Sequence, residues 1–216
     1  MLGVMGIGAG FINAAGRGGK EKFSGVKLFA LTTDPEINSI TGTDIVVKTI
    51  KGGVAHEDTY ASLDGDMLSI SADKNTEIII IGEITECEIG SNTYFSRISV
   101  TNTALTSLDC SYCYALQELN LSANTALTSL DCSDCSALQE LNLSTNTALT
   151  SLGCSYCSKI EIIYYPATNE DISTAVAGAI TDADAADGTV YTDSEGAYYS
   201  TIADAATEKG WTIEQL

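Results

Sequence analysis

The sequence predicts a β-dominated α/β repeat fold: a short solenoid of about four 22-residue coils, with a β-rich cap before it and an α/β cap after it. Near-identical segments recur 22 residues apart, strand-like runs precede them, and helix-like patterns follow. Because 44% of the 216 residues are hydrophobic, the chain can bury a sizeable core. The predicted division is 1–24, a glycine-rich tail or anchor; 25–83, the β-rich cap; 84–168, the solenoid; and 169–216, the α/β cap.

The predicted N-terminal cap consists of apolar runs rich in β-branched residues. They are separated by turns that contain glycine and aspartate, which is typical of short strands. The runs are "VKLFAL" (26–31), "DIVVKTI" (44–50), "DMLSISA" (66–72) and "TEIIIIGEI" (76–84). We expect these strands to form a small β-rich unit that closes the first coil.

The repeat occupies the middle of the chain. Three copies read "ALTSLDCSYCY" (104–114), "ALTSLDCSDCS" (126–136) and "ALTSLGCSYCS" (148–158), and between them lie "ALQELNLSANT" (115–125) and "ALQELNLSTNT" (137–147). The period of 22 splits into two half-units of 11, each built on L-x-x-L-x-(L/C)-x-x-(N/C). Weaker half-units on both sides raise the count to eight, or about four coils.

Each half-unit predicts one short strand followed by a turn. Segments such as Leu108-Asp109-Cys110 alternate inward and outward with the period of a strand, and small serines follow them. One half-unit cannot bury its leucines alone, but stacked coils give a continuous apolar column with parallel strands about 4.8 Å apart.

The C-terminal cap is predicted to contain two helices and two strands. Asn169 caps a helix that extends through Ile180, and a strand near "TVYTD" follows. A second helix covers about 196–209 and ends at Gly210, and "WTIEQL" returns as a strand.

This pattern resembles leucine-rich repeats of the nested kind, in which both halves of a coil read L-x-x-L-x-L-x-x-N. It is similar in particular to the cysteine-ladder repeats of internalin-type surface proteins and of gut-bacterial repeat proteins. The resemblance covers 84–168 and extends more weakly to both caps. It implies binding or adhesion at a cell surface, and it provides no catalytic residues to transfer. Cysteine occupies two slots in alternate half-units, which gives two ladders where the family shows one.

The cysteines are predicted to be structural. Three of them take an inward leucine slot, and three others take the slot that asparagine holds in the other half-units, where the resemblance implies an inward side chain that bonds turn backbone. The ladder residues are Cys110, Cys132, Cys154, Cys113, Cys135, Cys157, Asn124 and Asn146. Zinc, inter-coil disulfides and a redox pair are the alternatives. The periodicity explains every paired cysteine without a metal or cofactor, and Cys87 also fits an inward slot.

The outward positions are the candidate binding residues. Rows repeated almost unchanged from coil to coil suit a protein or a repetitive surface ligand better than one small molecule. The variable row Tyr112, Asp134 and Tyr156 is the most site-like, since tyrosine is favoured at interfaces. The other candidates are Asp109, Asp131, Glu118 and Glu140. An ordinary solvated face that arose by duplication is the alternative.

Several function classes are disfavoured. A formal charge of −19 argues against nucleic-acid binding, and no apolar run approaches the length of a membrane span. An enzyme is not expected, because His56 is the only histidine and no nucleophile is placed to use it. "TDADAADG" (181–188) lacks the last ligand of a calcium loop, and "GIGAG" (6–10) follows no strand, so no metal or dinucleotide is predicted.

The N-terminal residues 1–24 carry their basic residues after the apolar stretch, so they do not resemble a secretory signal. We hypothesise that they anchor the chain in a homo-oligomer or larger assembly, such as a phage virion or a surface complex. A structural component docked in this way is the alternative function. The location would then be virion-associated or cytoplasmic, whereas the family resemblance implies the cell surface.

Overall fold

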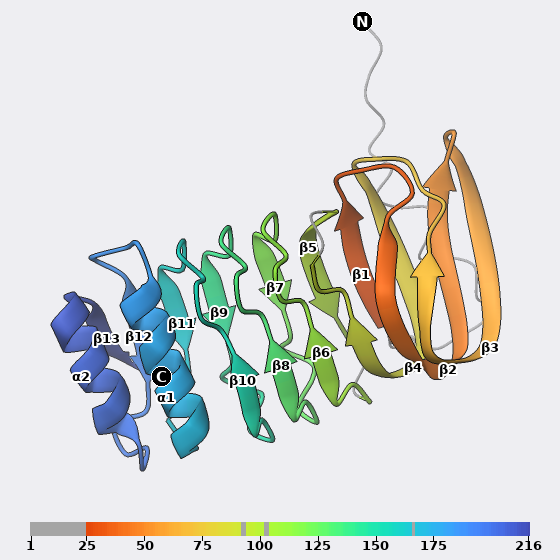
Figure 1. The fold of residues 1–216 in the computed structure, drawn as a ribbon. Coiled ribbons are helices and arrows are strands. Elements are labelled where there is room, and N and C mark those ends of the chain that lie inside the picture. Colours follow the sequence, from red (N-terminus) through yellow and green to blue (C-terminus); the bar gives the residue numbers. More distant parts are fainter. Residues whose placement is uncertain (1–24, 92–93, 102–103, 166) are drawn as a thin grey trace, which may run out of the picture.

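The structure is a computed structural model, and it describes residues 25–91, 94–101, 104–165 and 167–216. It is β-dominated, with a curled arrangement of two sheets and two helices that lie together at the C-terminal end (Figure 1). One sheet has nine strands and the other has four. Neither helix among these residues has the length and apolar character needed to span a bilayer.

The N-terminal part is an antiparallel sheet. It contains β1 (Gly25–Ala30), β2 (Glu36–Lys51), β3 (Val54–Ser69) and β4 (Thr76–Glu88), and β1 lies between β4 and β5 (Phe95–Val100). The four predicted runs all fall within strands or at their ends. The sequence reading was wrong about residues 54–65, which are not a turn but the first part of β3. This part is mostly exposed and shows no apolar alternation. Its pairing with β2 across the turn at Gly52 and Gly53 makes it a strand.

Parallel strands at a 22-residue offset follow on one side of the molecule. These strands are β6 (Ser107–Asp109), β8 (Ser129–Asp131) and β10 (Ser151–Gly153), which continue from β4. Their register aligns Cys87 with Leu108, Leu130 and Leu152. Threonine hydroxyls reinforce this side, because Thr128 Oγ1 and Thr150 Oγ1 each donate to the threonine carbonyl 22 residues earlier.

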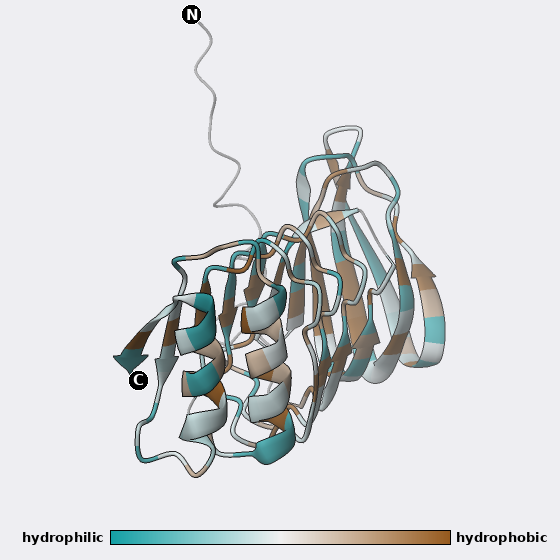
Figure 2. Cartoon of the chain, turned by 60° about the vertical axis from the view of Figure 1, so that its left-hand side comes forward, coloured by the Kyte–Doolittle hydropathy of each residue, from teal (hydrophilic) through white to brown (hydrophobic). Residues whose placement is uncertain are grey.

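The second side carries the alternate half-units. Its strands are β7 (Glu118–Asn120), β9 (Glu140–Asn142) and β11 (Ile162–Tyr164), so the chain crosses from one side to the other every 11 residues. Leucines from both sides fill the space between them, and the core is continuous from Val26 to Trp211. Figure 2 shows hydrophobic segments along the strands on both sides of this core.

Two helices and two strands close the C-terminal end. They are α1 (Glu170–Asp182), β12 (Thr189–Thr192), α2 (Tyr199–Lys209) and β13 (Thr212–Gln215). The two predicted helix-capping residues are confirmed. Asn169 Oδ1 accepts from Ile172 N at 3.2 Å at the start of α1, and Gly210 ends α2 with φ 83°. Helix α2 begins three residues later than predicted, because Gly196 lies in a turn. Helix α1 covers β10, where Asp182 Oδ2 accepts from Tyr156 N at 3.1 Å.

Candidate binding groove

The six paired cysteines are buried, and all seven thiols are free. Cys135 Sγ donates to the carbonyl oxygen of Cys110, and Cys157 Sγ donates to that of Cys132, each at 3.1 Å. Each bond joins a thiol to a carbonyl oxygen 25 residues earlier in the sequence. Asn146 Nδ2 makes the equivalent bond to Leu121 O at 3.2 Å. The second cysteine ladder therefore replaces the asparagine as an inward donor to the preceding turn.

Four of the seven thiols are hard to ionise, whereas the pKa of Cys157 is lowered, chiefly by its hydrogen bond to Cys132. Desolvation raises the pKa of Cys87 to about 12, and it also raises the pKa of Cys154. The pKa values of Cys110 and Cys132 lie well above the ordinary value, because each thiol is hydrogen-bonded to the thiol one repeat further on and is also buried. Since the thiolate is the reactive form, this environment is unsuited to redox or nucleophilic chemistry.

We expect the native protein to resist thiol reagents. At neutral pH, none of the seven cysteines should react with iodoacetamide or a chromogenic disulfide, whereas all seven should react in denaturant. Mass spectrometry of the labelled chain counts the modified sites. Chelator or reductant should leave the circular dichroism spectrum unchanged. Fast labelling of one C-x-x-C pair in the native state, or cooperative unfolding by chelator, would contradict a structural ladder.

The predicted binding residues Asp109 and Asp131 turn out to cap turns. Asp109 Oδ1 accepts from Ser111 N at 2.8 Å, and Asp131 Oδ1 accepts from Ser133 N at 2.9 Å. Each carboxylate thus satisfies the first backbone donor after its strand. This role accounts for the aspartates without a ligand.

Tyr112, Asp134 and Tyr156 lie in the turns that follow β6, β8 and β10, not on a strand face. All three adopt left-handed backbone, with φ of 57°, 59° and 59°. The two tyrosines are 46% and 65% exposed, and Tyr112 meets the ring of Tyr114 edge-on at 6.3 Å. The seven predicted binding residues therefore do not form one site. Two of them are the aspartates that cap turns, three lie in exposed turns, and the remaining two lie on another face.

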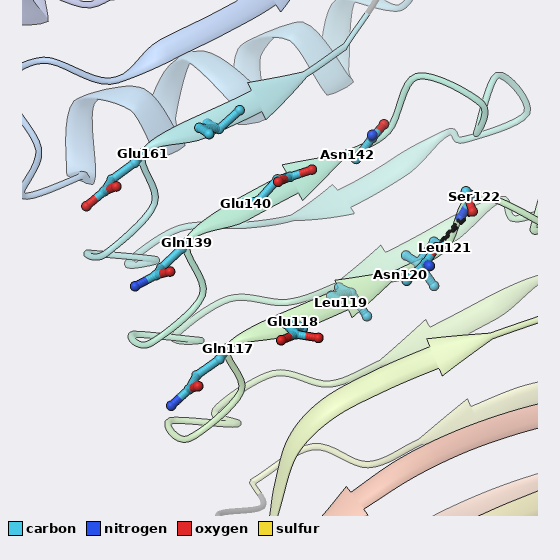
Figure 3. A pocket seen from close by; sticks show the side chains of 11 residues that line it. Gln117, Glu118, Leu119, Asn120, Leu121, Ser122, Gln139, Glu140, Asn142 and Glu161 are labelled. Atoms are coloured by element: carbon cyan, nitrogen blue, oxygen red, sulfur yellow. Dashed lines mark hydrogen bonds between the residues drawn. The ribbon is translucent and has the colours of Figure 1, made fainter. Parts of the chain in front are cut away.

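The remaining pair, Glu118 and Glu140, lies in a groove of about 490 Å³ on the outward face of β7, β9 and β11. Three rows of side chains line it (Figure 3). The rows are Gln117, Gln139 and Glu161; Glu118, Glu140 and Ile162; and Asn120 and Asn142. We call this surface the polar groove. A second hollow of about 290 Å³ shares Glu118 and Asn120 and extends the polar groove over β5 and β1.

The two sheets part inside the polar groove. Strand β7 is the last strand of the nine-stranded sheet, and β9 is the last strand of the four-stranded sheet. Gln117 N donates to Ser96 O at 2.8 Å, and Glu161 N donates to Gln139 O at 2.9 Å. Among the described residues, no equivalent bond joins Gln139 N to Gln117 O. Backbone polar groups therefore face the groove floor where the sheets part.

The two outward faces differ in how their polar side chains are used. On the first face, the threonine hydroxyls donate to the backbone of the preceding repeat, and the two aspartates accept from the backbone of their own turns. On the second face, the glutamine and glutamate side chains of the polar groove make no hydrogen bond or ion pair with any described residue. An array of polar groups with no internal role is what a binding surface requires.

The other candidate sites gain no support. His56 is exposed on β3, opposite Thr49. In the acidic segment 181–188, Asp182 binds Tyr156 N and Asp184 pairs with Lys159 at 3.2 Å. No group of three or more histidine, cysteine, aspartate or glutamate side chains in the described ranges is arranged to hold a metal ion. The glycines at 6–10 and the hypothesised anchor 1–24 lie outside the described residues, so the assembly hypothesis stays a prediction.

Comparison with known proteins adds no assignment: no family model, curated protein or solved structure matches this chain. Sequence reasoning named Glu118 and Glu140 but missed their joint groove with Glu161. It also missed the parting of the sheets, because the half-units "ALQELNLSANT" and "ALQELNLSTNT" are almost identical. The available signal was the contrast between T-S-L-D on one face and Q-E-L-N on the other.

Proposed function

We propose that this chain is a non-enzymatic binding or adhesion module on a leucine-rich-repeat solenoid, and that the polar groove holds an extended ligand. The observation that carries the proposal is the set of outward glutamine and glutamate side chains that make no hydrogen bond or ion pair within the described chain, placed in a groove at successive 22-residue repeats. Such a surface repeats one recognition element at each coil, which suits a polymer or an extended protein segment.

The rest of the molecule supports a passive scaffold. The buried thiols have no reactive role, and the core runs from the N-terminal sheet to the C-terminal cap. Binding residues held on short strands over a continuous core are pre-organised, so little conformational entropy is lost when a ligand docks. The leucine-rich-repeat assignment is supported by the L-x-x-L pattern and by the parallel registers at 22-residue offsets.

We expect blocking of the polar groove to abolish binding. Because the native cysteines are buried, an introduced surface cysteine can be labelled selectively with a bulky polyethylene-glycol maleimide. Glu140→Cys places the label in the groove, and Ser129→Cys places it at the matching position of the opposite face. Binding to an immobilised panel of polysaccharides and polypeptides of both charges is measured by interferometry.

The labelled groove variant should bind its polymer at least about tenfold more weakly than the unlabelled protein, which corresponds to about 1.4 kcal/mol. The label on the opposite face should leave binding within about twofold. Equal loss from both labels, or no loss from the groove label, would contradict the assignment of the groove.

A further inference from the structure

We propose that the ligand of the polar groove is a neutral, hydroxyl-rich polymer: a polysaccharide chain that lies across β5, β7, β9 and β11. This inference rests on the proposed function and names the ligand class. It is carried by the donors and acceptors of the groove, their repetition, the aromatic surfaces along it and the distribution of charge.

The hydrogen-bonding groups of the polar groove match hydroxyls. Asn120 Oδ1 accepts from Ser122 N and Oγ, at 3.1 and 2.8 Å, and Asn142 Oδ1 accepts from Ser144 in the same way. Each asparagine is thereby oriented, and its Nδ2 group is left to donate to a ligand. The glutamates only accept, and the glutamines do both. Hydroxyl groups both donate and accept, so they satisfy all three kinds of side chain.

The groups repeat in the direction a polymer would follow. Gln117, Glu118 and Asn120 on β7 recur as Gln139, Glu140 and Asn142 on β9. Strands β9 and β11 pair in parallel, so their outward residues lie about 4.8 Å apart, a step close to the length of one pyranose unit. A ligand that presents the same groups at each step can therefore bond equivalent residues in turn.

Aromatic rings flank these polar groups on the same outward face. Asn142 is in register with Tyr164, and Tyr164 with Tyr191. The two tyrosine rings stack with centroids 4.4 Å apart and planes 10° apart. Toward the other end, the Arg97 guanidinium occupies the face of the Phe29 ring at 4.5 Å, so the aromatic surface open to a ligand is the tyrosine pair. A sugar ring has an apolar C–H face that packs on such rings while its hydroxyls reach the polar rows.

The distribution of charge argues against strongly charged ligands. Glu118, Glu140 and Glu161 would repel a polyanion. Lys27 and Arg97 line the continuation over β1 and β5 together with Glu77 and Glu118, so this half has no excess of either charge and offers no particular attraction to a polyanion or a polycation. The ammonium groups of a lysine-rich peptide would be attracted only to the carboxylates of the polar groove and would not bond the asparagine and glutamine donors. A neutral polymer fits both halves.

The test titrates the full chain with neutral hexasaccharides of glucose, xylose, mannose and N-acetylglucosamine, together with hexalysine and a hexauronate. The binding constants are measured by calorimetry. At least one neutral hexasaccharide should bind, and its monosaccharide should bind at least about 100-fold more weakly, because it engages one coil only. Glu118→Ala/Glu140→Ala and Tyr164→Ala should each weaken binding at least about tenfold. Ser107→Ala/Ser129→Ala, the matching positions of the opposite face, should leave it unchanged.

The possible outcomes test the ligand class, the location of the binding site and the proposed function separately. Binding of hexalysine or the hexauronate alone, with loss in the Glu118→Ala/Glu140→Ala variant, would overturn the ligand class and leave the proposed function standing. Neutral oligosaccharide binding that survives every groove substitution would overturn the location. Failure of every probe to bind would overturn the ligand class, and the label-blocking experiment on the wider panel then decides the proposed function separately.

Discussion

Replacing Asn146 by aspartate is expected to lower the free energy of unfolding by at least about 4 kcal/mol at pH 7. Asn146 is 2% exposed, and its Nδ2 group donates to Leu121 O at 3.2 Å and to Asn124 O at 2.8 Å. A carboxylate of the same shape has no donor, so it would place a negative charge against two carbonyl oxygens in the core. Urea unfolding followed by circular dichroism measures the change.

The chain provides a matched control at the same slot. Cys135 and Cys157 already make the equivalent bond, so Asn146→Cys should cost only about 1–2 kcal/mol. Asn146→Ala removes the donor without adding charge and should fall between the cysteine and aspartate variants. The deficit of Asn146→Asp should narrow as the pH falls from 7 to about 4, because burial raises the pKa of the introduced carboxyl in the folded state and the protonated acid regains one donor. An aspartate variant within about 1 kcal/mol of the parent would show that this ladder is not a significant source of stability.

The sequence predicted the structure best at positions where the residue type has a single structural role. Leucine and cysteine at fixed offsets predicted which residues are buried, and Asn169 predicted the start of α1. The cysteine in the asparagine slot was predicted to be an inward, structural side chain; that Cys135 and Cys157 also donate to turn carbonyl oxygens was added by the structure. The predicted relations are local, so the repeat spacing was enough to indicate them.

The candidate site was less predictable, because outward residues have several possible roles. Asp109 and Glu118 both read as exposed carboxylates, yet one bonds the backbone of its own turn and the other has no partner in the described chain. The parting of β7 from β9 follows no local signal, since the two half-units are nearly identical. The place where the two sheets separate involves strands far apart in the sequence, which no short motif contains.

The second large expected effect is loss of stability at alkaline pH. The pKa of Cys87 is about 12 in the folded protein, because the thiol is desolvated and lies near Glu88. The ordinary pKa of an exposed thiol is about 8.5–9, so the unfolded chain releases this proton first. The folded state binds more protons, and stability therefore falls as pH rises. The contribution is fully present below about pH 8.5 and is lost by about pH 12, a change of roughly 4 kcal/mol for this one thiol.

The pKa values of Cys110, Cys132 and Cys154 are raised as well, so their contributions add to the fall, whereas the lowered pKa of Cys157 opposes it. A chain of ordinary stability, about 5–15 kcal/mol, should therefore unfold cooperatively between about pH 9 and 12. Urea unfolding at successive pH values, followed by the fluorescence of the buried Trp211, measures the slope. The variant Cys87→Ala separates the effect of thiol ionisation from that of tyrosine ionisation. At pH 7 the variant should be less stable than the parent, because the substitution leaves a cavity. As the pH rises, this difference in stability should shrink and then reverse. Parallel stability curves for the two proteins would mean that the buried thiols do not control the alkaline limit of the fold.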